Sequence, residues 1–148
     1  MRRFTSRLAA VVVLAGSWAL PVSGAHAGEA ARTYHATLTG AQEVKPGDPD
    51  GSASADVTVS ADRGTLCYDV HDIQGLDPVV GAHIHRGAVG EDGPPTIPLT
   101  ASPEGGFKGC VAAPDWLDEG MKSDFTGYYI NLHTHEFPAG AIRGQLGL

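Results

Sequence analysis

The sequence contains few basic residues, only two cysteines, and no long apolar run beyond its first 27 residues. Among 148 residues, ten are lysine or arginine and seventeen are acidic. Arg2, Arg3 and Arg7 lie in residues 1–27, so residues 28–148 carry seven basic and seventeen acidic residues and a net charge of −10. An acidic domain without a basic patch is not expected to bind nucleic acid or an anionic membrane surface. We therefore expect no nucleic-acid partner and no membrane span.

The sequence also lacks a long segment with the 3.6-residue apolar period of a helix. Instead, apolar and polar residues alternate in short segments, as in 33–39, 54–60, 65–70, 127–134 and 139–146. Turn sequences rich in glycine, proline and aspartate separate them, at 45–51, 61–64, 91–95 and 102–106. Such alternation is typical of half-buried strands. It predicts one all-β domain over residues 28–148, an antiparallel Greek-key β-sandwich or barrel, in which only 114–125 forms a short helical turn capped by Asp115.

The first 27 residues have the pattern of a secretory signal peptide. Three arginines precede an apolar run from Leu8 to about Leu20, and the small residues Ala25 and Ala27 end the segment. A transmembrane helix requires a longer apolar run. We expect cleavage after Ala27 and export to the periplasm or the cell exterior. Cleavage after Ala25 is the alternative, and it would expose His26 as an amino-terminal copper chelator.

The two cysteines, Cys67 and Cys110, are expected to form a disulfide, because exported thiols tend to oxidise. Neither belongs to a C-x-x-C motif of the kind that binds metal. Two thiolate metal ligands remain the alternative.

Four of the seven histidines form two H-x-H pairs, His83 with His85 and His133 with His135. On a strand, residues i and i+2 share one face. The apolar neighbours of each pair take the core parity, so all four histidines are predicted to face away from the core. Imidazole pairs of this kind bind copper or zinc. If the two strands are neighbours, His83, His85 and His133 form a metal site, with His135 as the fourth candidate.

Four further residues are candidates for supporting roles. Tyr129 and Asn131 share the predicted outer face of His133, where Tyr129 can form a wall of the site and Asn131 can orient the His133 ring. Glu43 and Arg143 are predicted to form a structural ion pair, or Arg143 to donate hydrogen bonds to loop carbonyls. A ligand-binding role for this charged pair is the alternative.

The motifs LTGAQEV (38–44), GAHIHRGAVGEDGP (81–94) and YYINLHTHEFPAGAIRGQL (128–146) resemble those of the CHRD domain, named for chordin. The resemblance covers residues 33 to 147 and implies an exported protein with an immunoglobulin-like or superoxide-dismutase-like sandwich. AHIHRGAVG is also similar to the H-V-H strand of copper/zinc superoxide dismutases, whose metals lie outside the barrel. Neither resemblance implies a settled activity.

Three functions remain open at this point. The first is a binding protein that holds a copper or zinc ion. The second is a non-catalytic module that binds another exported protein by an edge strand or a loop, with the histidines linking loops. The third is a dismutase-like redox enzyme, which is disfavoured because the full ligand set of a dismutase, including a bridging histidine and an aspartate, is not found in matching order. No G-x-S-x-G motif is present, so a serine hydrolase is not expected.

Overall fold

The computed structural model describes residues 30–148, and these residues fold into eight antiparallel strands and little helix. The predicted signal peptide lies outside the described residues. The elements are β1 (Arg32–Thr39), the 3-10 turn η1 (Gly40–Gln42), β2 (Ser52–Val59), β3 (Thr65–Gln74), β4 (Val79–Arg86), β5 (Pro95–Pro98), β6 (Phe107–Ala112), α1 (Leu117–Lys122), β7 (Tyr128–Thr134) and β8 (Ile142–Gln145). The predicted all-β fold is confirmed.

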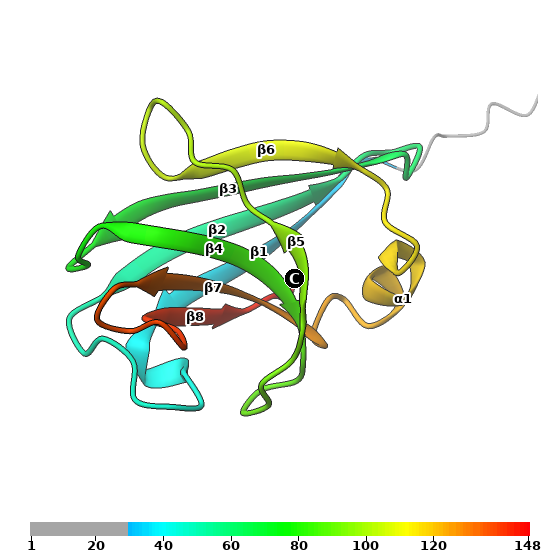
Figure 1. Ribbon diagram of the computed structural model, residues 1–148. Coiled ribbons are helices and arrows are strands. Elements are labelled where there is room, and N and C mark those ends of the chain that lie inside the picture. Colours follow the sequence, from blue (N-terminus) through cyan, green and yellow to red (C-terminus); the bar gives the residue numbers. More distant parts are fainter. Residues whose placement is uncertain (1–29) are drawn as a thin grey trace, which may run out of the picture.

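The strands form one curled sheet in the order β5–β4–β7–β8–β1–β2–β3–β6. Strands β1, β2 and β3 follow one another as hairpins, whereas β4 pairs with β7 and β3 with β6, which are distant in sequence. At the β1–β8 seam the two strands share a single pair, Thr39 with Arg143. The sheet therefore divides at this seam into two four-stranded halves that face each other as a sandwich (Figure 1).

Alternating side chains of both halves fill the core between them. On β1, Tyr34, Ala36 and Leu38 are buried, and on β7 Tyr128, Ile130 and Leu132 are buried. These are the residues that the period-two pattern predicts to face inward. On the faces opposite to the core, polar side chains follow the other parity. The candidate histidines of β4 and β7 belong to this outer face.

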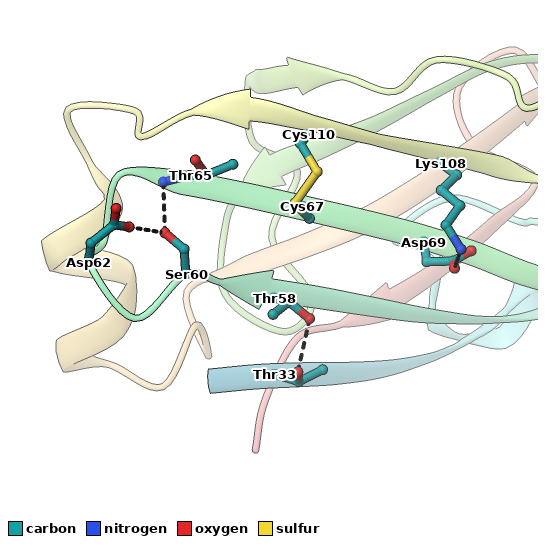
Figure 2. The surroundings of a disulfide bond; sticks show 9 residues. All are labelled: Thr33, Thr58, Ser60, Asp62, Thr65, Cys67, Asp69, Lys108 and Cys110. Carbon is teal, nitrogen blue, oxygen red and sulfur yellow. Dashed lines mark hydrogen bonds and ion pairs between the residues drawn. A yellow bond between two sulfur atoms is a disulfide. The ribbon is translucent and has the colours of Figure 1, made fainter. Parts of the chain in front are cut away.

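The predicted disulfide between Cys67 and Cys110 is confirmed. These residues are direct partners across the β3–β6 pair, and their sulfur atoms are bonded. Figure 2 shows the bond on the outer face of the sheet, with the Lys108–Asp69 ion pair further along the same two strands. Strand β6 is an edge strand of the sheet, and the disulfide links it covalently to its one neighbour, β3.

Removal of this disulfide is expected to lower stability without changing the fold. The bond closes a loop with a sequence separation of 43 residues. The chain-entropy model gives about 4 kcal/mol for a loop of this size, and measured losses are typically about 2–4 kcal/mol. Urea unfolding of the Cys67→Ala/Cys110→Ala double variant, compared with the oxidised wild-type protein, measures this loss. The β3–β6 pairing itself should survive, because its backbone hydrogen bonds do not depend on the sulfur atoms.

The expected helical turn is present as α1, but its start differs from the prediction. Trp116, rather than Asp115, is the N-cap residue, and no side chain caps the helix. The Trp116 ring stacks on the Tyr128 ring with 4.6 Å between the ring centroids, so aromatic packing holds the chain where the turn begins. Within residues 30–148, no helix is long and apolar enough to cross a bilayer.

Candidate metal centre

Strands β4 and β7, which carry the two H-x-H pairs, are direct neighbours in the sheet. Their antiparallel register places Gly81 opposite His133, His83 opposite Asn131, and His85 opposite Tyr129. Sequence parity alone could predict the face of each pair but not this adjacency. The register brings His133 diagonally next to His83, on the same outer face.

Three of the four histidines form a compact cluster. One ring nitrogen from each of His83, His85 and His133 lies within 4.8 Å of the other two. Nδ1 of His83 and Nε2 of His133 lie 3.3 Å apart, within hydrogen-bond distance. Among residues 30–148, this is the one group of histidine, cysteine, aspartate or glutamate side chains arranged to hold a metal ion.

His135 lies outside this cluster. Strand β7 ends at Thr134, and His135 occupies the exposed bend that follows. The alternation that would place His135 on the same face as His133 therefore stops one residue too early.

Backbone carbonyls fix the orientation of two of the rings. Nδ1 of His85 lies 2.8 Å from the Gly93 carbonyl oxygen, and Nδ1 of His133 lies 3.1 Å from that of Pro138. A carbonyl oxygen only accepts hydrogen bonds, so both Nδ1 atoms carry the proton and both Nε2 atoms carry a lone pair. Metal-ligating histidines commonly have this arrangement.

The lone pair of His85 has no protein partner. His85 is 9% exposed, and its Nε2 atom is buried without a hydrogen bond. Burial lowers the pKa of His85 and, for the same reason, that of His133, despite the hydrogen bonds to Gly93 and Pro138 that act in the opposite direction. Both rings are therefore neutral at pH 7, which is the protonation state that a metal requires.

The outer face around His85 is covered rather than open, which differs from the simple outward placement predicted from parity. The covering segment is residues 87–94, which join β4 to β5 and are called the cover loop below. Arg143, 1% exposed, donates to the carbonyl oxygens of Glu91 and Ala88, each at 2.8 Å. Gln145 donates to the Gly87 carbonyl at 2.9 Å. These bonds hold the cover loop over the sheet.

Tyr129 connects the cover loop to the histidine cluster. The Tyr129 ring stacks on the His85 ring with 4.8 Å between the ring centroids. The Arg143 guanidinium lies 3.5 Å from the centroid of the Tyr129 ring. The Tyr129 hydroxyl accepts a hydrogen bond from the Gly93 amide at 3.1 Å. Arg143, Tyr129 and His85 thus form one contiguous stack. A displacement of Arg143 would therefore change the position of the His85 ring through Tyr129.

A second loop, residues 40–51, brings Glu43 to the other side of the cluster. Nδ2 of Asn131 donates to Oε1 of Glu43 at 2.5 Å. Burial raises the pKa of Glu43 to about 7, an effect that the nearby Arg143 and the Asn131 hydrogen bond oppose. Arg143 donates hydrogen bonds to loop carbonyls, which is one of the two structural roles predicted for it. The His133 ring is oriented by the Pro138 carbonyl and not by Asn131. The cover loop and the 40–51 loop both lie at the lower end of the molecule in Figure 1. An ion pair joins them, with 4.0 Å between Nζ of Lys45 and Oδ2 of Asp92.

Replacement of Glu43 by glutamine should change how stability depends on pH. Between about pH 4.5 and 7 the folded wild-type protein keeps a proton on Glu43 that the unfolded chain has lost. The stabilisation present below this range is therefore lost as pH rises through about 7. We expect Glu43→Gln to gain on the order of 1 kcal/mol relative to wild type between pH 4.5 and 8, since the carboxyl is partly exposed. Urea unfolding at both pH values measures it; identical pH profiles would contradict it.

Sequence reasoning missed the two carbonyls that orient the rings, those of Gly93 and Pro138. Gly93 had a detectable signal in the turn sequence EDGPP. A Cβ atom at this position would lie 1.5 Å from the Arg86 carbonyl oxygen, so the chain can pass there only as glycine. Pro138 gave no comparable signal, because any residue type can offer a backbone carbonyl.

The fold and the site define the molecule as an all-β, disulfide-linked domain whose outer face gathers three histidines under a fixed loop. The chain belongs to the CHRD domain family, since the family model described as the CHRD domain matches residues 34–146. The comparisons with curated proteins and with solved structures found no match. Membership in this family and the disulfide both fit an extracellular protein.

Proposed function

We propose that this protein is an exported CHRD module that binds one copper or zinc ion through His83, His85 and His133. The observation that carries the proposal is the buried, unpartnered Nε2 atom of His85 within a cluster of three imidazoles. A buried nitrogen without a partner is costly to the fold. Coordination of an ion would satisfy it.

The spacing of the nitrogens supports coordination of a single ion. Two nitrogens bound at 2.0–2.1 Å with a tetrahedral angle lie about 3.4 Å apart. The His83–His133 nitrogens lie 3.3 Å apart, and the three ligand nitrogens lie within 4.8 Å of one another. Three neutral imidazoles without a thiolate or carboxylate suit copper or zinc better than magnesium or calcium.

Metal titration of untagged protein tests this proposal. Wild-type protein is titrated by calorimetry with Zn²⁺, Cu²⁺ and, under reducing conditions, Cu⁺. We expect one ion per chain, and no such site in the His83→Ala/His133→Ala double variant. A double variant that binds with unchanged affinity would refute the site. Elemental analysis of protein purified from its native compartment then identifies which metal it carries.

Metal affinity should fall in acid, because protons compete for the imidazole lone pairs. Burial lowers the pKa of His85 and His133 below the ordinary value of 6.5. We therefore expect an affinity that is nearly independent of pH around neutrality and falls as the solution becomes acid. Titrations at half-unit intervals from pH 5 to 8 measure this dependence. A histidine site whose affinity stayed level down to pH 5 would contradict it.

A structural role for the histidines is the second candidate function, and the ring-to-loop hydrogen bonds favour it. His85 and His133 each fasten a loop to the sheet through Gly93 and Pro138. In that case the protein is a metal-free extracellular module that binds another exported protein. It would have the same melting temperature with a chelator as with added metal, whereas the metal proposal requires a rise with metal.

A further inference from the structure

Two buried polar atoms on the outer face of β4 and β7 have no hydrogen-bond partner, Nε2 of His85 and Oδ1 of Asn131. The proposed metal ion accounts for the first and leaves the second unexplained. Asn131 is 3% exposed, so bulk water does not readily reach its side chain. A buried amide oxygen without a donor is costly to the fold and calls for a physical explanation.

The position of Asn131 places this oxygen beside the histidine cluster. Across the sheet, Asn131 has two direct neighbours, His83 on β4 and Arg143 on β8. It also precedes His133 by two residues on the same face of β7. Asn131 is therefore the polar residue next to two of the three proposed ligands.

The amide nitrogen of Asn131 is already committed to the opposite side. It donates to Glu43, which arrives in the 40–51 loop that follows β1, the strand next to β8. Gly140 keeps this contact compact, because a Cβ atom there would lie 2.5 Å from Nδ2 of Asn131 and 2.6 Å from both Glu43 carboxylate oxygens. The nitrogen therefore has its partner, and the oxygen is the arm of the amide that has none.

We propose that the ion held by His83, His85 and His133 carries a fourth, exchangeable ligand, a water molecule, and that this water donates a hydrogen bond to Oδ1 of Asn131. This inference rests on the proposed function. Three histidines leave a tetrahedral ion with one open position, the arrangement of metal sites that bind a water or substrate. Asn131 is a positioning residue for that ligand, and Glu43 holds Asn131 in place.

An exogenous anion that competes with the water tests this inference. Co²⁺-loaded wild-type protein is titrated with azide, and the visible absorption of Co²⁺ reports occupancy of the open position. Azide has no hydrogen to donate to Asn131, so it must displace a water that Asn131 holds. We expect Asn131→Leu to bind azide about 5–10-fold more tightly, which corresponds to the loss of one hydrogen bond to the competing water. His35→Ala, an exposed site on the other half of the sandwich, should match wild type.

A measurement on the wild-type protein covers the case in which Asn131→Leu fails to fold. Cu²⁺-loaded wild-type protein should enhance the relaxation of water protons, and saturating azide should remove most of the enhancement. A loaded protein without this enhancement, or Asn131→Leu with wild-type azide affinity, overturns the role of Asn131 and leaves the metal site intact. Failure of the wild-type protein to bind Co²⁺, Cu²⁺ or Zn²⁺ refutes the proposed function itself.

Discussion

Replacement of His85 by alanine should weaken metal binding at least 100-fold. His85 is the most buried of the three clustered histidines, and its Nε2 atom is the one without any partner in the protein. Loss of an outer hydrogen-bond partner of a ligand commonly costs about 10–100-fold in metal affinity. Loss of a ligand itself should cost more. Calorimetric titration with Zn²⁺ and Cu²⁺ measures the change.

A second variant separates loss of the ligand from loss of packing. His85 also stacks on Tyr129, so alanine removes a ring from a covered surface. His85→Phe keeps an aromatic ring on Tyr129 and removes only the nitrogens. We expect it to lose metal binding as His85→Ala does, and to lose only about 1 kcal/mol of stability, for the hydrogen bond to the Gly93 carbonyl, while His85→Ala loses the ring packing as well.

His135→Ala is the matched control for these variants. His135 belongs to the same motif as His133 but lies exposed beyond the end of β7. We expect its affinity to stay within about twofold of wild type, in contrast to the 10–100-fold losses typical of groups that support a metal site. A large loss in His135→Ala, with no loss in His85→Ala, would show that the ion binds elsewhere.

The strand pattern could be predicted from the sequence because burial imposes it locally. Leu66, Tyr68 and Val70 on β3 and Ala55, Val57 and Val59 on β2 are buried as period-two alternation requires. The disulfide was also accessible, since two cysteines in an exported chain have one pairing. The strand pattern depends on residues that are close together in the chain, so the sequence contains the information needed to predict it.

The three-dimensional part of the site was not accessible in the same way. Whether β4 and β7 are neighbours depends on how distant strands pair, and they are separated by β5, β6 and α1 in the chain. Parity also could not show that the cover loop folds back over His85. That loop is held by Arg143 and Gln145, which lie more than fifty residues away in sequence. Long-range polar contacts of this kind have no period for a sequence to reveal.

Helix placement shows a related limit. An aspartate before a short helical segment predicts an N-cap, and Asp115 fits that pattern. In the structure the Trp116 ring packs against Tyr128 and Phe125, and it is partly buried against the core. For a helix of six residues, an aromatic pair contributes about 0.5–1.5 kcal/mol beyond the area it buries, which matches the roughly 1 kcal/mol of a side-chain cap.

Replacement of Arg143 by methionine should lower the free energy of unfolding by about 2–4 kcal/mol. The guanidinium is buried, donates to the carbonyls of Glu91 and Ala88, and stacks on Tyr129. Methionine fills similar space but leaves the Glu91 carbonyl without a donor, and the Ala88 carbonyl keeps only the Glu91 amide. Because the same cover loop supplies the Gly93 carbonyl that orients His85, metal affinity should also fall, by about 10–100-fold. Urea unfolding of metal-free protein and a Zn²⁺ titration measure the two effects separately.

Arg86→Met is the matched control, because it removes the same side chain from an exposed ion pair with Glu119. Exposed pairs contribute about 0–1 kcal/mol, so this variant should remain close to wild type in both measurements. Arg143→Lys should fall between the two, since a single ammonium cannot reach two carbonyls in the fork geometry of arginine. If Arg143→Met cost no more than Arg86→Met, the cover loop would be held by other contacts, and the link from Arg143 through Tyr129 to His85 would be wrong.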